Sequence, residues 1–268
     1  MNIRKKVFLS HIHEEKDLAI LIQGAIEDEF SGFVDVFVSS DGRSILAGTN
    51  FLKRIEEMLL NASGAIFLIS HRSVKRNWIN FELGAIWIRG VNDVVIPAIP
   101  FCHSGITPKN LPPPLNSLNA IQANDENQLE KAFYSLQRAF GVNGKLKTDF
   151  SALSEKIKDI ERKNILCSRL ARIISIFVGK KFFELLPEWE NLANGSTVEV
   201  RKSGIGNSII GELEILKKSS PEIDIDYDLS NIREVSDTDG NTYSSDICLK
   251  MPVDIFISNK TELSNYEY

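Results

Sequence analysis

Trp78 and Glu82 lie four residues apart in a segment with the apolar spacing of a helix, predicted to run from about Asn77 to Arg89. The apolar residues that should face the core of the protein are Ile79, Leu83 and Ile86. Side chains four apart share a helix face, so the indole and the carboxylate are expected to be neighbours. A carboxylate held in this way can stabilise positive charge that develops in a transition state. The alternatives are a solvated carboxylate for Glu82 and a core or rim aromatic for Trp78.

Two further groups of polar residues could take part in binding. Ser10 and His11 end a short apolar run, where they could face a ligand or cap the following helix. Asp41, Gly42 and Arg43 lie in a polar loop, where backbone amides and a guanidinium could bind phosphate. A solvated turn explains the loop equally well, so both alternatives stay open.

Two segments resemble metal-binding motifs, but neither has a complete set of ligands. His11 and His13 alternate and could face one way, but no Cys or third His lies near them, so no metal site is expected. The run Asp237-Thr-Asp-Gly-Asn241 imitates the start of a calcium loop, yet Cys248 occupies the twelfth position, where such a loop carries Glu. A hairpin turn is the better interpretation of that run.

Short apolar runs alternate with helical periodicities over the first 140 residues. The predicted strands are Lys6–Ser10, Val34–Val38, Gly64–Ser70 and Val94–Ile99, and the predicted helices are Lys16–Glu29, Phe51–Leu60, Asn77–Arg89 and Asp125–Phe140. This alternation implies right-handed crossovers onto a parallel sheet with helices on both faces. Ligands of such sheets bind at the carboxyl ends of the strands, which is where Ser10 and His11 are placed.

The second half of the chain follows a different pattern. We divide the sequence into an α/β domain at residues 1–141, a helical connector at 148–186 and a small β-rich domain at 187–268. Residues with period-two spacing in that last domain are Val198 and Val200, Ile223, Ile225 and Tyr227, and Val253, Ile255 and Ile257. It carries 16 Asp and Glu against 7 Lys and Arg, which argues against nucleic-acid binding. We interpret it as a sensor or oligomerisation module.

Length and composition agree with two globular domains. The chain has 268 residues, 43% of them hydrophobic and 25% charged, with a net charge of −5. No apolar run approaches the roughly 20 residues of a membrane span, and the basic N-terminus precedes too short an apolar run for a signal peptide. Cys102, Cys167 and Cys248 show no paired spacing, which is typical of free thiols in a reducing compartment. We therefore expect a cytoplasmic protein with no membrane partner.

Three segments, in this order, resemble the TIR domain family over about 140 residues. Val7-Phe8-Leu9-Ser10-His11 resembles the opening strand of the family. Val36-Phe37-Val38, followed by Ser40-Asp41-Gly42-Arg43, resembles the second strand and its loop, although that loop lacks the common Pro. The strand at 66–70 with the later Trp78 and Glu82 resembles the signature in which Trp precedes Glu by four. The resemblance implies a flavodoxin-like parallel sheet flanked by helices.

In activity, the resemblance implies a TIR domain of the NAD-cleaving type, with Glu82 as the catalytic carboxylate and NAD as substrate rather than cofactor. Nicotinamide leaves as a neutral molecule, so no general acid is required, unlike in sugar hydrolysis. One anion under the ribose then suffices to stabilise the oxocarbenium-like transition state. Trp78 would flank the nicotinamide or ribose, while Ser10, His11, Asp41, Gly42 and Arg43 would help to bind NAD. The product, ADP-ribose or a cyclic isomer, stays open.

Partners also follow from the resemblance. TIR domains associate with one another, and single-TIR chains of this size suggest bacterial antiphage immunity, with an activating ligand or protein acting through the C-terminal domain. The alternative is a non-catalytic TIR adaptor that works only through contacts between TIR domains. Trp78 together with Glu82 favours the enzyme.

Overall fold

The structure is a computed structural model that describes residues 4–39, 51–90, 96–192, 195–219, 226–237, 240–264 and 266. It divides into two compact units at the bond between Arg162 and Lys163. This division lies inside the predicted connector rather than at its start, because the first turns of α5 (Phe150–Phe177) pack into the first unit. None of the described helices combines the length and apolarity needed to cross a bilayer.

The first unit alternates strands and helices. Its elements are β1 (Lys5–Ser10), α1 (Lys16–Glu29), β2 (Val34–Ser39), α2 (Phe51–Asn61), β3 (Gly64–Ile69), α3 (Asn77–Gly90), β4 (Ala98–Cys102), β5 (Ile121–Gln122), α4 (Glu126–Phe140) and the start of α5. The strands form one sheet in the order β2-β1-β3-β4-β5, and every described pairing is parallel. This is the flavodoxin-like order, in which the direction of winding changes between β1 and β3.

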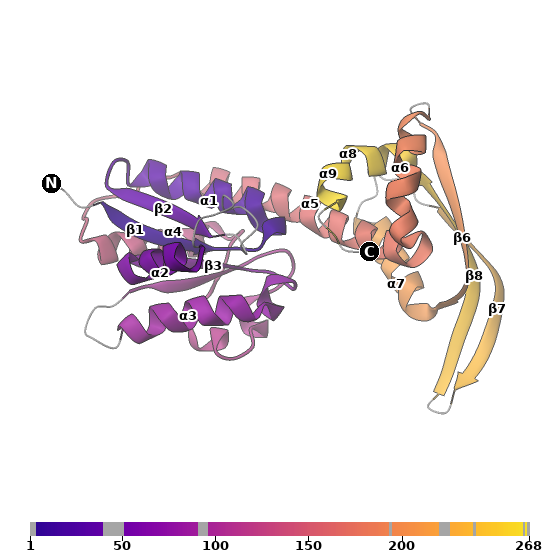
Figure 1. Cartoon of the computed structure of the whole chain (residues 1–268), viewed down its shortest axis with the longest axis horizontal. Coiled ribbons are helices and arrows are strands. Elements are labelled where there is room, and N and C mark those ends of the chain that lie inside the picture. The colour runs from indigo at the N-terminus through magenta and orange to yellow at the C-terminus, as the bar shows by residue number, and fades with distance from the viewer. Residues whose placement is uncertain are drawn as a thin grey trace. The chain divides into compact units, whose positions relative to one another are not determined.

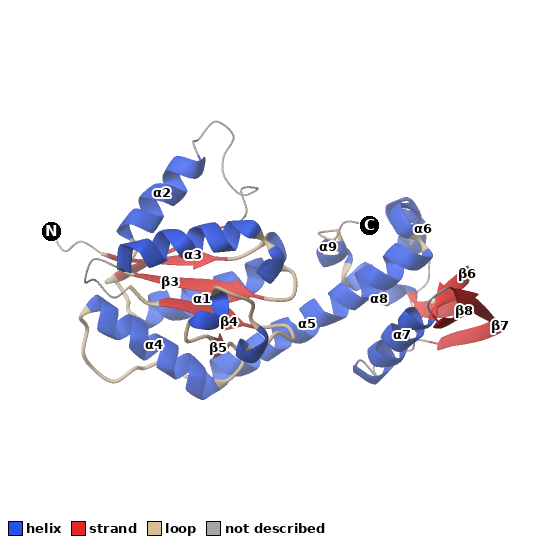
Figure 2. Ribbon diagram, turned by 90° about the horizontal axis from the view of Figure 1, so that it is seen from below, coloured by secondary structure: helices blue, strands red, loops and turns tan. Residues whose placement is uncertain are grey.

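Alternation along the strands gives the sheet two apolar faces, and Figure 2 shows helices on both sides of it. Val7 and Leu9 of β1 face the core under α1, α4 and the start of α5. Phe8 faces the opposite core, under α2 and α3. Both faces are covered, which explains why the central strand β3 reads as a continuous apolar run. The predicted three-layer arrangement is confirmed.

One predicted strand was wrong in its bounds. The prediction placed the strand at Val94–Ile99 and did not extend it through Pro100, which cannot donate a backbone hydrogen bond. Val94 and Val95 lie outside the described residues. The strand instead begins at Ala98 and continues through Phe101 and Cys102, both fully buried. Burial of these two side chains outweighs the missing donor of one residue.

The second unit is a three-stranded antiparallel sheet with helices. Its elements are the end of α5, α6 (Phe182–Glu190), β6 (Thr197–Gly206), α7 (Asn207–Ser219), β7 (Asp226–Asp237), β8 (Gly240–Pro252), α8 (Val253–Ser258) and α9 (Lys260–Leu263). Figure 1 shows β8 between β6 and β7. Inward residues such as Leu249 and Met251 form a core with the helices. The pairing of Asp237 with Gly240 confirms the hairpin turn.

The C-terminal strand expected at Val253–Ile257 was wrong, because the segment is the helix α8. Short apolar runs fit either structure. In the helix, Val253 and Phe256 lie three residues apart, and each is only 1% exposed. Pro252 directly precedes the helix in extended conformation. Ile223 and Ile225 lie outside the described residues.

We expect a chain ending at Gly141 to be markedly less stable than one ending at Arg162. Leu153 and Ile157, 6% and 0% exposed, belong to the core of the first unit and would be lost. Burial of two such side chains contributes about 4 kcal/mol, a large share of the usual stability of a domain. Urea denaturation followed by circular dichroism measures the difference.

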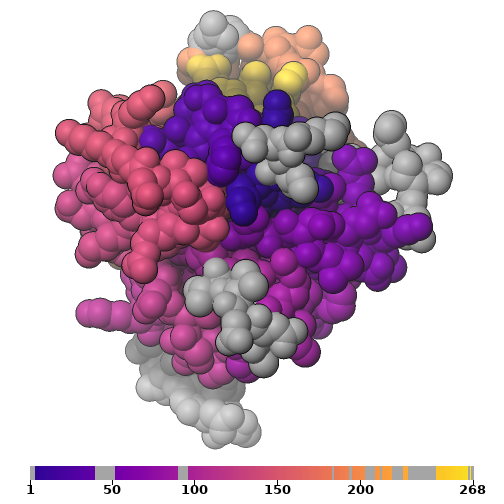
Figure 3. Space-filling model, turned by 90° about the vertical axis from the view of Figure 1, so that its left-hand side faces the viewer, coloured from indigo at the N-terminus to yellow at the C-terminus, as the bar shows by residue number. Residues whose placement is uncertain are grey.

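Polar contacts of the same segment would be lost as well. Figure 3 shows pink segments from the end of the unit beside indigo and purple segments from its start. Backbone N–H groups of Lys147 and Thr148 donate to the Glu29 carboxylate at 2.9 and 2.7 Å. Glu161 accepts from the backbone N–H of Ser104 at 3.2 Å. Equal denaturation midpoints for the two chains would show that this segment is not part of the fold.

Candidate functional site

Glu82 lies on α3, and both oxygens of its carboxylate are bound. Ser10 at the end of β1 donates to Oε2 at 2.5 Å, and Ser39 at the end of β2 donates to Oε1 at 3.0 Å. The indole N–H of Trp78 donates to the same Oε1 at 2.8 Å. The sheet and the helix together therefore fix the plane and the position of this carboxylate.

The register of β1 and β2 explains why two serines meet one carboxylate. The strands are parallel and pair Ser10 with Ser39, so both hydroxyls arise at the same level of the sheet. Their sequences match, since each ends in Val-Phe, one apolar residue and Ser. α3 brings Glu82 to this level because Ile79, Leu83 and Ile86 pack against the sheet, as the sequence predicted.

Burial determines the electrostatics of the site. Glu82 is 0% exposed, and loss of hydration raises the pKa of its carboxyl group to about 7. The hydrogen bonds from Ser10, Ser39 and Trp78 act in the opposite direction and favour the anion. All three donors are neutral, so the anion keeps its full charge. Such a group can stabilise a cation that forms beside it.

The predicted site residues fall into two groups. Ser10, Trp78 and Glu82 are brought into direct contact. His11 is buried beside them, and its backbone N–H donates to the carbonyl of Ser39 at 3.3 Å. Asp41, Gly42 and Arg43 lie outside the described residues, so their binding role stays a prediction.

Ser39 is the site residue that the sequence interpretation missed. The repeated Val-Phe-x-Ser ending of the two strands was a usable signal, because parallel neighbours with equal patterns place equal residues at one edge. A second missed feature is the buried pair of His103, after β4, and Glu15, whose Nε2 and Oε1 atoms lie 3.2 Å apart. No sequence signal joins residues 88 positions apart.

The buried pair of Glu15 and His103 stabilises loops at the carboxyl ends of the strands, where the serines also lie. Glu15 also accepts the backbone N–H of Ile12 at 3.1 Å, which fixes the turn between β1 and α1. The contacts with His103 hold the pKa of Glu15 below its usual value, although burial alone would raise it. The loops after β1 and β4 are thus tied together close to the predicted ligand edge.

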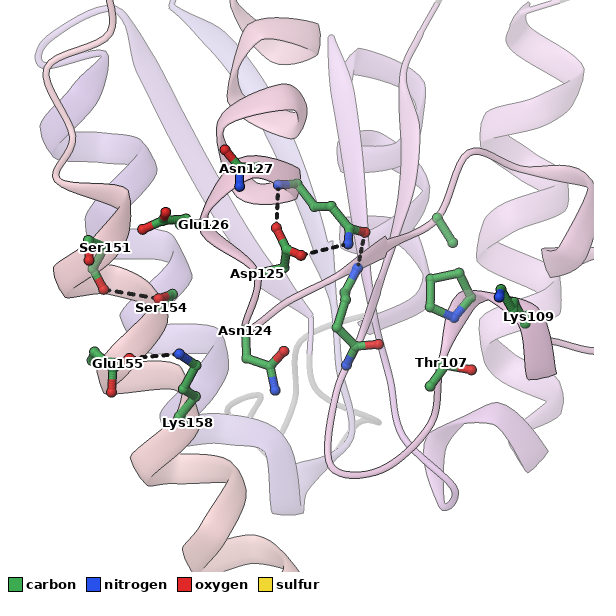
Figure 4. Close-up of a pocket in the computed structure, with 14 residues that line it drawn as sticks. Thr107, Lys109, Asn124, Asp125, Glu126, Asn127, Ser151, Ser154, Glu155 and Lys158 are labelled. Atoms are coloured by element: carbon green, nitrogen blue, oxygen red, sulfur yellow. Dashed lines mark hydrogen bonds and ion pairs between the residues drawn. The ribbon is translucent and has the colours of Figure 1, made fainter.

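A large cavity lies away from Glu82. It has a volume of about 860 Å³ and lies between β5, α4 and α5 (Figure 4). Two of its charged side chains pair with each other, since Lys158 donates to Glu155 at 2.6 Å, and Asp125 caps α4 by accepting the backbone N–H of Gln128. Glu82 is not among its lining residues. The volume of a cavity alone therefore does not identify the reactive site. The buried carboxylate of Glu82, with its three hydrogen-bond donors, is the better candidate.

Comparisons with known proteins identify the family of the first unit. A family profile described as "TIR domain" matches residues 7–136. Among solved structures, a metazoan TIR-STING receptor from C. gigas is 18% identical with a TM-score of 0.35, over 69% of this chain and 50% of that chain. The TIR domains of the activated Roq1 resistosome, which directly recognises the pathogen effector XopQ, are 16% identical with a TM-score of 0.31, over 58% of this chain and 99% of that chain.

The chain thus spans half the length of the first of these structures. A search among curated proteins gave no significant match. The family match runs from Val7 in β1 to Leu136 in α4 and includes Ser10, Ser39, Trp78 and Glu82. Residues 7–136 therefore form a TIR domain.

Proposed function

We propose that this TIR domain cleaves the bond between nicotinamide and ribose in NAD. The observation that carries the proposal is the Glu82 carboxylate, held by neutral donors from the carboxyl ends of β1 and β2 and from α3. The bond from the anomeric carbon to the pyridinium nitrogen breaks, and its electron pair leaves with neutral nicotinamide. Water attacks the anomeric carbon and loses a proton, which gives ADP-ribose. A ribose or adenine nucleophile in place of water would give a cyclic isomer.

Glu82 would act on the cation that forms at the anomeric carbon. Its charge stabilises the oxocarbenium-like transition state more than the ground state, which is the condition for catalysis. Trp78 holds Oε1 from one side and presents an aromatic ring beside it. Neither role needs a cofactor or a metal ion.

The proposal is tested by incubating the purified chain with NAD and identifying the products by chromatography. Nicotinamide together with ADP-ribose or a cyclic isomer supports it. A second candidate function is a non-catalytic adaptor, favoured by the complete burial of Glu82, which in that case would be a structural carboxylate. Intact NAD under conditions in which the protein assembles would favour the adaptor.

We expect NAD cleavage to rise with pH through a limb near pH 7. Glu82 must be ionised to act, and burial raises its pKa to about 7. At pH 5.5 most molecules therefore carry a protonated Glu82 and are inactive. The pH profile of kcat/KM measures this limb in the free enzyme. A profile that is flat from pH 5 to 8 would separate activity from the ionisation of Glu82.

We further propose that TIR domains of separate chains associate, with the loop after β2 of one protomer meeting α3 of the next. The α3 surface supports this, because Phe81, Trp87 and Ile88 are 52%, 71% and 72% exposed. Large exposed apolar side chains on one helix are typical of interaction surfaces. A head-to-tail contact of this kind permits open filaments.

For the remaining chain we propose a regulatory role in antiphage immunity. Residues 148–186 would connect the TIR domain to a sensor or oligomerisation module at 187–268, which would receive the activating ligand or protein. The acidic balance of that region favours a protein or a small molecule over nucleic acid.

A further inference from the structure

We infer that Ser10 and Ser39 are a pair of positioning residues that hold the Glu82 carboxylate in its working orientation and keep it anionic. The inference rests on the proposed function and deepens it, because it assigns the residues that make Glu82 competent. It adds Ser39 to the site and gives Ser10 a role toward the carboxylate rather than toward NAD.

The geometry provides the first step. Each serine binds a different oxygen, Ser10 at 2.5 Å and Ser39 at 3.0 Å, so the carboxylate plane cannot turn without breaking a bond. Both hydroxyls belong to register-paired strand residues, which are 2% and 3% exposed. Groups on paired strands are more rigid than groups on loops, and such support preorganises a site.

The chemistry of the donors provides the second step. A Lys or Arg beside Glu82 would keep it ionised but would neutralise the charge that the transition state needs. A serine hydroxyl stabilises the anion by a hydrogen bond and adds no opposing charge. Both serine bonds lower the pKa of Glu82 against the effect of burial. Neutral donors therefore suit a carboxylate that must act on a cationic carbon while buried.

Trp78 offers a readout that does not depend on activity. Its indole N–H donates to Oε1 at 2.8 Å, so its NMR signal should follow the ionisation of Glu82. The chain has three Trp residues, and Trp78→Phe identifies the signal. In the full-length protein we expect a titration midpoint near pH 7, where the pKa of Glu82 lies, and no titration in Glu82→Gln.

The test compares substitutions at each serine. Ser39→Ala and Ser10→Ala are expected to raise the midpoint by about one pH unit, since a hydrogen bond to a charged group contributes about that much. The acidic limb of kcat/KM should move by the same amount. Ser39→Thr keeps the hydroxyl and should stay near the wild type, while Ser39→Val has the same shape without it and should behave like Ala. If an Ala variant fails to fold, the comparison of Ser39→Thr with Ser39→Val still shows whether the hydroxyl lowers the pKa of Glu82.

Ser70→Ala is the matched control, because Ser70 is a buried residue directly after β3 whose hydroxyl contacts Ser73. It should leave the midpoint unchanged. Unshifted midpoints in the folded Ala and Val variants would overturn the inference. If the midpoints shift as expected but the wild type leaves NAD intact, the proposed function fails while the positioning of Glu82 stands.

Discussion

Glu82→Gln is expected to abolish NAD cleavage while the protein keeps its fold. Glutamine has nearly the same shape and keeps one accepting oxygen, but it offers no anion to the developing cation. Loss of an electrostatic group of this kind typically lowers kcat about 100-fold or more. Single-turnover and steady-state NAD consumption, measured at pH 8 where Glu82 is ionised, would quantify the loss.

A matched control for this substitution is Glu57→Gln, which removes a carboxylate from the exposed face of α2. It should leave turnover unchanged. If Glu82→Gln retained more than about a tenth of wild-type turnover, Glu82 would have no place in the mechanism.

The same variant carries a stability signature that is independent of activity. The folded-state pKa of Glu82 is raised from 4.5 to about 7, so the protonated form stabilises the native state. That contribution is fully present below pH 4.5 and is lost as the pH rises through 7. Relative to Glu82→Gln, the wild type should therefore lose about 3 kcal/mol of unfolding free energy between pH 4.5 and 8. Denaturant titrations at both pH values measure it.

The sheet was largely predictable because local signals and burial agree in it. β1, β2 and β3 lie within one residue of their predicted ends, because each contains a short run of apolar residues, which in β3 is buried throughout. α1 has the predicted bounds. β5 was not predicted, because two residues carry no periodicity. The C-terminal helix α8 was mistaken for a strand for a similar reason.

The site was predictable in part, and the limit is physical. Trp78 and Glu82 share a helix face, so their contact follows from spacing alone. The contact of Glu82 with Ser39 depends on the register of the strands and on the position in which α3 packs against the sheet. No local sequence pattern determines either. Burial of Glu82 follows from the same tertiary packing. The sequence could therefore identify Glu82 as the candidate carboxylate, but it could not predict its raised pKa.

The specific activity of the full chain is expected to rise by up to about 100-fold when TIR domains assemble. In this structure Glu82 is 0% exposed, so this protomer is closed to substrate. Opening must uncover Glu82 while the serine bonds keep its carboxylate in place, and an assembly that favours the open state would drive it. A shift from 1:99 to 99:1 requires about 5.5 kcal/mol of differential binding, within reach of one interface.

The measurement is specific activity against protein concentration, with mass followed by light scattering in the same samples. Trp87→Glu and Ile88→Glu place charge on the exposed apolar surface of α3 and should abolish both assembly and the rise in activity. Ile20→Glu is the matched control, because Ile20 is 52% exposed on α1, which covers the opposite face of the sheet. Full turnover from a species that stays monomeric at every concentration would show that the closed protomer opens by itself, and that the exposed α3 surface serves a purpose other than activation.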